Sequence, residues 1–148
     1  MSRIDHIACC VDQSEASLRG LHHAARVREQ SGAARLTAVH LIPPPVYVGV
    51  YYPPPEPPSQ DIPDWLTEMV ADVPDCEIVV VDSYANFPPA EAVAWAKEND
   101  VDILVAASHQ GFFKRMVMGS FAAYLAYHSE CPVLLVPPPV PDEPVEAA

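Results

Sequence analysis

Short apolar runs alternate with amphipathic stretches along this 148-residue chain, and this alternation limits the choice of fold more than any other feature. A strand, a helix and a second strand in succession form a parallel pair with a right-handed crossover. The apolar runs show little polar alternation, as strands buried on both faces require. The pattern therefore predicts an α/β fold, a single open, doubly wound, parallel five-stranded sheet with helices on both faces. The strands are expected at residues 3–11, 36–42, 77–81, 101–107 and 132–136.

Four helices are expected between these strands. The first should begin after Ser14, a suitable N-cap, and end before Gly32, a residue that suits the left-handed position after a helix. Leu18, Leu21 and Ala25 recur at helical spacing and should form its buried side. The other helices are expected at residues 62–73, 88–99 and 119–129.

Proline marks the segments that should lie outside the sheet. Residues 43–60 hold eight of the eighteen prolines. Because proline lacks an N–H and fixes φ, this segment is expected to be a loop insertion. It would serve either as a surface flap or linker, or as a lid or docking strip for a partner. One domain is expected over residues 1–137, followed by a disordered acidic, proline-rich tail at 138–148.

The acidic composition excludes two classes of partner. With a net charge of −12 and a pI near 4.6, the surface should repel phosphate backbones and anionic lipids, so neither nucleic acid nor a membrane is expected to bind. No signal peptide or membrane span is evident, and a cytoplasmic location is expected. The four cysteines lack zinc or redox spacing and are expected to be buried free thiols at strand positions, and no metal-ligand set is evident.

Four segments should meet at one edge of the predicted sheet. In an open parallel sheet, ligands bind outside the carboxyl ends of the strands. Residues 11–14, 40–42 and 107–111 reach this edge, and a helix starts at 119–122. A helix N-terminus offers free N–H groups and a positive dipole end, which suit an anion. Gly119 would let a ligand approach the backbone closely, and Ser120 adds a hydroxyl.

The same segments resemble a known family. Residues 107–120 (A-S-H-Q-G-F-F-K-R-M-V-M-G-S) and 131–136 (C-P-V-L-L-V) are similar to the signature end of the universal stress proteins. Residues 11–17 (V-D-Q-S-E-A-S) resemble the opening of that family. The resemblance covers nearly the whole chain in the right order. It implies the strand order 3-2-1-4-5 and a homodimer.

Many members of that family bind ATP through a G-x₂-G-x₉-G-[S/T] loop, from which this chain departs. Ala107 and Gln110 stand where the first two glycines belong, and the stretch from Gln110 to Gly119 is one residue short. The chain resembles instead the branch of the family that lacks ATP binding. ATP or a related adenine nucleotide is therefore an open alternative as cofactor, with weak affinity expected.

By this resemblance, Asp12 would reach the nucleoside and the backbone of Leu41 would contact adenine. Each also has a structural interpretation, because Asp12 could only stabilise its turn and Leu41 could belong to the core. His109 could contact phosphate or organise its own loop, and His40 is interpreted as a structural histidine. The candidate nucleotide-binding residues are Asp12, Leu41, Ala107, His109, Gly119, Ser120 and Phe121.

The resemblance implies a universal stress protein, a non-catalytic, dimeric stress-response regulatory module with a degenerate nucleotide pocket. The last strand should lie at the edge of the sheet and pair with its twin. An unknown regulatory protein is a further expected class of partner. Two alternatives stay open, an interaction scaffold without ligand and a nucleotide hydrolase using Asp12, His109 and Ser120. The dimer interface would consist of Val133, Leu134, Leu135 and Val136.

Overall fold

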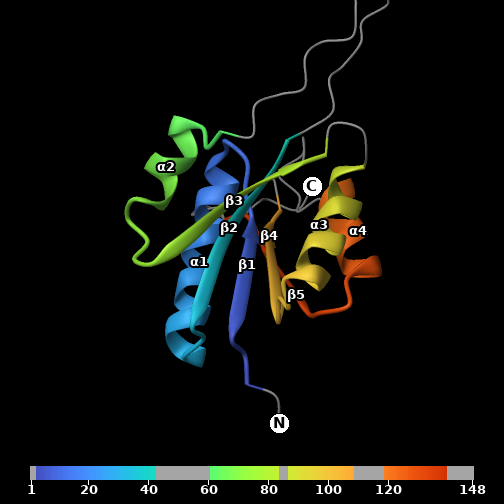
Figure 1. The fold of residues 1–148 in the computed structure, drawn as a ribbon, viewed down its shortest axis with the longest axis horizontal. Helices are drawn as coiled ribbons and strands as arrows, with labels where there is room; N and C mark the ends of the chain where they lie inside the picture. The colour runs from blue at the N-terminus through green and yellow to red at the C-terminus, as the bar shows by residue number, and fades with distance from the viewer. Residues whose placement is uncertain (1–2, 43–60, 84–86, 109–118, 140–148) are drawn as a thin grey trace, which may run out of the picture.

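The computed structural model describes residues 3–42, 61–83, 87–108 and 119–139. Its five strands form one sheet in the order β3-β2-β1-β4-β5, and every neighbouring pair is parallel, which confirms the predicted fold (Figure 1). The proline-rich segment 43–60, residues 140–148 of the tail and His109 lie outside the described residues. In chain order the elements are β1 (His6–Cys10), α1 (Glu15–Ser31), β2 (Arg35–Ile42), α2 (Asp64–Val70), β3 (Cys76–Asp82), α3 (Pro88–Glu98), β4 (Ile103–Ala107), α4 (Ser120–His128) and β5 (Val133–Val136).

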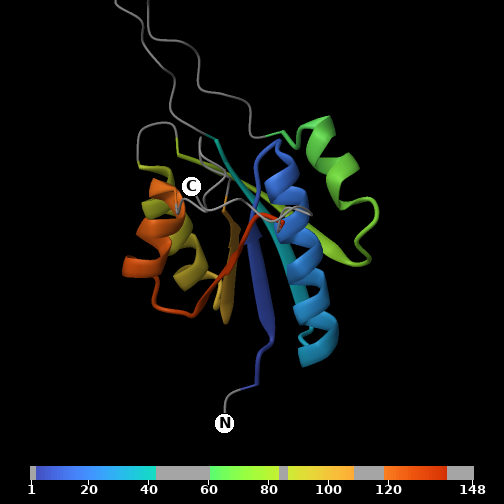
Figure 2. The ribbon, with the colours of Figure 1, turned by 180° about the vertical axis from the view of Figure 1, so that it is seen from behind.

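The helices cover the sheet in two layers. Figures 1 and 2 show α1 and α2 on one side of the sheet and α3 and α4 on the other. Alternate residues of β1 enter the two cores, with Ile7 and Cys9 facing α1 and Ala8 and Cys10 facing α3 and α4. Both faces of the central strand are therefore buried, as a parallel sheet requires.

The ends of α1 form as the sequence predicts. The Ser14 side chain accepts a hydrogen bond from the Ser17 N–H, and Gly32 takes the left-handed conformation with φ 72°. The expected buried side is wrong in one position, because Leu18 is 37% exposed. The inner face of α1 is instead centred on small residues near Gly20, where an added Cβ would lie 3.2 Å from that of Ala107. Leu18 lies outside the set of buried α1 residues, which are Ala16, Ser17, Gly20, Leu21 and Ala24.

Several elements are shorter than the sequence suggests. The first strand covers five residues instead of nine and α2 covers seven instead of twelve, because regular backbone hydrogen bonding ends before the apolar pattern does.

Cys9 and Cys10 are buried free thiols as predicted. Cys76 and Cys131 are also free but only partly buried, and Cys131 precedes β5. Within the described residues, no helix is long and apolar enough to cross a membrane.

Candidate functional site

A cavity of about 360 Å³ lies at the carboxyl edge of the sheet. The ends of β1, β2 and β4 form one side, and the first residues of α3 and α4 form the other. Among the predicted site residues it brings together Asp12, Leu41, Ala107, Gly119 and Phe121. Ser120 starts α4 beside them but is not part of the lining. Val11, His40 and Ala122 belong to segments expected at this edge, but they were not named as binding residues. The sequence pattern did not point to the other lining residues, which are Cys10, Ser17, Pro88 and Ala106.

Asp12 is held by the turn that joins β1 to α1. Its Oδ1 accepts hydrogen bonds from the hydroxyls of Ser17, at 2.8 Å, and Ser14. The Ser14 hydroxyl oxygen also accepts the Ser17 N–H at 3.1 Å, which caps the helix. Among the described residues, none donates a hydrogen bond to Oδ2 of this exposed carboxylate. The turn therefore uses one oxygen of Asp12 and leaves the other without a donor among the described residues.

His40 has the structural role that the sequence suggests. Its Nδ1 lies 2.9 Å from the Val11 carbonyl oxygen, to which it donates. The Trp65 ring packs edge-on against the imidazole, with centroids 4.9 Å apart and planes at 90°. These contacts fix the end of β2 against the end of β1, so they shape the wall of the cavity.

The start of α4 leaves its backbone open. Gly119 is the N-cap. Among the described residues, no side chain caps the free N–H groups and no atom lies within 4 Å of a Cβ built at Gly119. The Gly119 φ of −60° suits any residue, so glycine is not required there for the conformation of the chain. Space at this position is available to a ligand that approaches the helix N-terminus.

The described lining carries no lysine or arginine. Asp12 is the one carboxylate among these lining residues, and Lys114 and Arg115 lie outside the described residues. Burial, with a smaller contribution from nearby Cys131, raises the pKa of the Cys10 thiol to about 12, so it is a neutral apolar group and not a nucleophile. The cavity suits an uncharged, partly aromatic ligand surface better than a cluster of negative charges.

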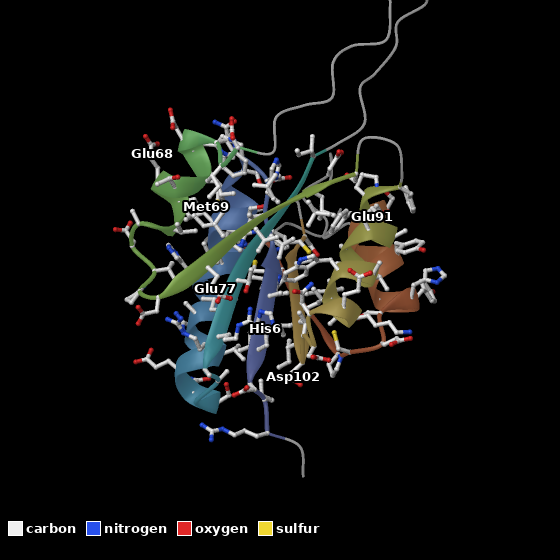
Figure 3. The ribbon with its side chains drawn as sticks, viewed as in Figure 1. His6, Glu68, Met69, Glu77, Glu91 and Asp102 are labelled. Atoms are coloured by element: carbon white, nitrogen blue, oxygen red, sulfur yellow. The ribbon has the colours of Figure 1, made fainter. Side chains whose placement is uncertain are left out.

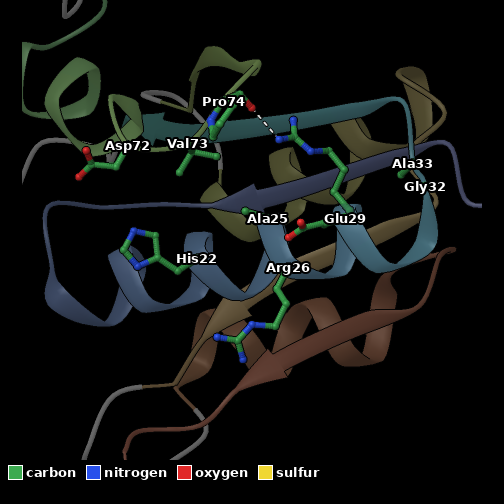
Figure 4. Close-up of a pocket in the computed structure, with 10 residues that line it drawn as sticks. His22, Ala25, Arg26, Glu29, Gly32, Ala33, Asp72, Val73 and Pro74 are labelled. Carbon is green, nitrogen blue, oxygen red and sulfur yellow. Dashed lines mark hydrogen bonds between the residues drawn. The ribbon is translucent and has the colours of Figure 1, made fainter.

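A second hollow, of about 620 Å³, is lined by α1 and by the segment that joins α2 to β3 (Figure 4). Although larger, it lies away from the carboxyl ends of the strands. Arg28 forms part of its wall and donates to the carbonyl oxygens of Pro74, at 2.6 Å, and Asp75, at 3.1 Å. Arg28 therefore fastens the turn between α2 and β3 to α1, which is a structural role.

No group of three or more His, Cys, Asp or Glu side chains in the described part of the chain could hold a metal ion.

Comparison with known proteins gives one family. The model of the universal stress protein family matches residues 3–137. No curated protein matches the sequence.

Solved structures share the fold. A universal stress protein from Archaeoglobus fulgidus has 20% sequence identity and a TM-score of 0.68, with 89% of this chain and 98% of that chain covered. A universal stress protein in complex with cAMP has 25% identity and a TM-score of 0.64, covering 91% of this chain and 98% of that one. A universal stress protein from Archaeoglobus fulgidus in complex with dAMP has 18% identity and a TM-score of 0.61, covering 91% of this chain and 99% of that one.

Proposed function

The chain belongs to the universal stress protein family, and on that premise we propose that it is a non-catalytic, dimeric regulatory module whose cavity binds an adenine mononucleotide. The observation that carries the proposal is the cavity at the carboxyl edge of the sheet, which joins Asp12, Leu41 and the open backbone of Gly119. Structural relatives bound to cAMP and dAMP support the same ligand class.

The residues present fit the parts of a mononucleotide unequally. Leu41, Ala106 and Phe121 offer an apolar slot for a planar base. The outward oxygen of Asp12 would accept a hydrogen bond from a ribose hydroxyl, and the N–H groups at the start of α4 would receive one phosphate. Because Gln110 stands where the family's loop has a glycine, a triphosphate should bind more weakly than a monophosphate.

Calorimetry with AMP, cAMP and ATP on the full chain tests this proposal. AMP should bind, and ATP should bind less tightly. Gly119→Ala places a methyl group in the open space beside the helix start, so it should weaken AMP binding by about tenfold, equivalent to ~1.4 kcal/mol. The thermal midpoint should not fall, because the backbone of Gly119 is ordinary.

Ala126→Ser is the matched control, because Ala126 is exposed on the same helix and is absent from the cavity lining. It should change neither binding nor stability. If the unmodified chain binds none of the three nucleotides at millimolar concentration, the ligand proposal is wrong and the interaction scaffold replaces it. Nucleotide turnover that Ser120→Ala abolishes would instead establish the hydrolase.

A further inference from the structure

His6 is a buried histidine at the amino end of β1, whereas the cavity lies at the carboxyl ends of the strands. It lies on β1 and is 3% exposed. Both ring nitrogens have partners, since Nδ1 is 3.0 Å from the carbonyl oxygen of Asn99 and Nε2 is 2.8 Å from the hydroxyl oxygen of Thr37. Figure 3 shows His6 between Glu77 and Asp102, which come from different parts of the chain. The nucleotide proposal does not use this residue.

The hydroxyl of Thr37 has a second partner. It donates to Oε2 of Glu77 across a distance of 3.0 Å. The same carboxylate oxygen accepts from Nε and Nη2 of Arg35, at 3.2 and 2.9 Å. The hydrogen bonds from Arg35, which are the main cause, and from Thr37 lower the pKa of Glu77, so its carboxylate is ionised at neutral pH and can only accept.

Only one placement of protons makes all three contacts, from Asn99 to His6, from His6 to Thr37 and from Thr37 to Glu77, into hydrogen bonds. A carbonyl oxygen cannot donate, so the contact with Asn99 requires a proton on Nδ1 of His6. A hydroxyl has one proton, and Thr37 gives it to the carboxylate of Glu77. The contact between Thr37 and Nε2 of His6 then needs a proton on Nε2 as well. A singly protonated ring would leave two acceptors facing each other at one of these three contacts, of which the contact between Thr37 and His6 is buried and the other two are partly buried, and such a pair is unfavourable.

We propose that His6 is an imidazolium ion in the folded protein and forms, with Thr37 and Glu77, a proton-dependent tie between strands β1, β2 and β3. The register is compatible with the tie, because Thr37 lies opposite Glu77, and His6, which lies opposite Arg35, is the diagonal neighbour of Thr37. The carbonyl of Asn99 extends it to the end of α3. Folding thus binds a proton at a site where a buried neutral histidine would be the ordinary arrangement.

The charged groups around His6 favour a cation. Glu77 faces it from β3, and Asp102 faces it from the segment before β4, where Oδ2 accepts the N–H groups of Asp5 and His6 at 2.8 and 2.9 Å. Those two backbone hydrogen bonds, with a smaller contribution from the His6 ring, lower the pKa of Asp102. Arg35 on β2 is the opposing positive group, paired with Glu77. The uncharged ring of Trp95 on α3 packs edge-on against the His6 ring, with the ring centroids 6.1 Å apart.

Nitrogen-15 NMR of the imidazole rings in the full-length chain tests the proposal directly. At neutral pH, both ring nitrogens of His6 should carry a proton, and the signals are assigned by their loss in His6→Gln. The Nδ1 signal of His40 is an internal reference, because the contact of this nitrogen with the Val11 carbonyl oxygen requires a proton on it. A His6 spectrum with one protonated nitrogen at neutral pH would overturn the proposal, whatever the variants do.

Two substitutions at Thr37 separate the tie from simple packing. Thr37→Ser keeps the hydroxyl and should keep His6 doubly protonated, whereas Thr37→Val keeps the shape and should leave one proton on the ring at neutral pH. In the unmodified chain, the folding equilibrium constant should fall as pH rises above about 6.5, by at most about tenfold per pH unit, since the folded state then holds the proton that the unfolded state releases. That fall should persist in Thr37→Ser and flatten in Thr37→Val. Equal pH dependence in the two variants contradicts the proposal.

Discussion

At the scale of single residues, the turn after β1 shows how one side chain can serve both folding and binding. Asp12, Ser14 and Ser17 form a closed set of hydrogen bonds that begins α1. The Ser17 hydroxyl oxygen also accepts the N–H of Asp12 at 2.8 Å, so the backbone of the turn is fixed before any ligand arrives. A pre-formed acceptor costs little entropy when a ligand binds.

Ser14→Ala should therefore lower the free energy of unfolding by about 1 kcal/mol, the usual cost of removing an N-cap. The loss has two sources, the uncapped N–H of Ser17 and the missing donor to Asp12. Urea unfolding followed by circular dichroism measures it. Ser14→Thr retains the hydroxyl and should stay close to the unmodified chain. Equal losses in both variants would show that capping is not the cause.

At the scale of elements, α4 links core packing to the candidate site. This helix has nine residues, and Leu125 is its one side chain of 0% exposure among the described residues. Phe121 and Ala122 in its first turn, together with the N-cap Gly119, form part of the wall of the cavity. Because so short a helix is not stable alone, its position depends on packing against the sheet and α3.

Leu125→Ala should cost about 2–5 kcal/mol, because it removes a fully buried side chain and leaves a cavity. It should also weaken AMP binding, since the start of α4 is then less well held. Tyr127→Ala on the same helix is the control. Tyr127 is 81% exposed, so its removal should change the free energy of unfolding by less than about 0.5 kcal/mol. A loss below about 1 kcal/mol for Leu125→Ala would mean that packing on α4 is loose.

At the scale of the whole molecule, β5 is an edge strand, as predicted, and pairs only with β4 among the described strands. Val133 and Leu135 pack partly buried against the layer of α3 and α4, whereas Leu134 is 38% exposed. An unpaired apolar edge favours association with a second chain. We therefore retain antiparallel pairing of two copies through β5 as the proposed dimer.

Leu134→Lys is expected to give a folded monomer, because a charge enters the proposed interface without disturbing the core. Val133→Lys combined with Leu135→Lys should also remove the dimer, but it would charge the α3 and α4 core and lower stability. Leu18→Lys is the matched control, since Leu18 has 37% exposure on α1 and should leave the dimer intact. Sedimentation at tens of micromolar measures the outcome. An unmodified chain that sediments as a monomer refutes the interface.

The sequence by itself determined the features that depend on neighbouring residues along the chain. Apolar runs alternating with helical stretches required a parallel sheet, and the caps Ser14 and Gly32 bounded α1. Because parallel strands end at a common edge, the meeting of Asp12, Leu41 and Ala107 followed from the same pattern. The strand order came from the resemblance to a family, since local periodicity does not say which strands are neighbours.

The tertiary structure alone decided what depends on register and on the approach of separate elements. Pro88 and Ala122 joined the cavity because α3 and α4 pack over its edge, which no local pattern encodes. The contacts of His6 needed three strands aligned to within one residue, because a shift by one turns a side chain to the other face. Leu18 is exposed for a similar reason, since helical period defines an apolar side but tertiary contact decides where its centre lies.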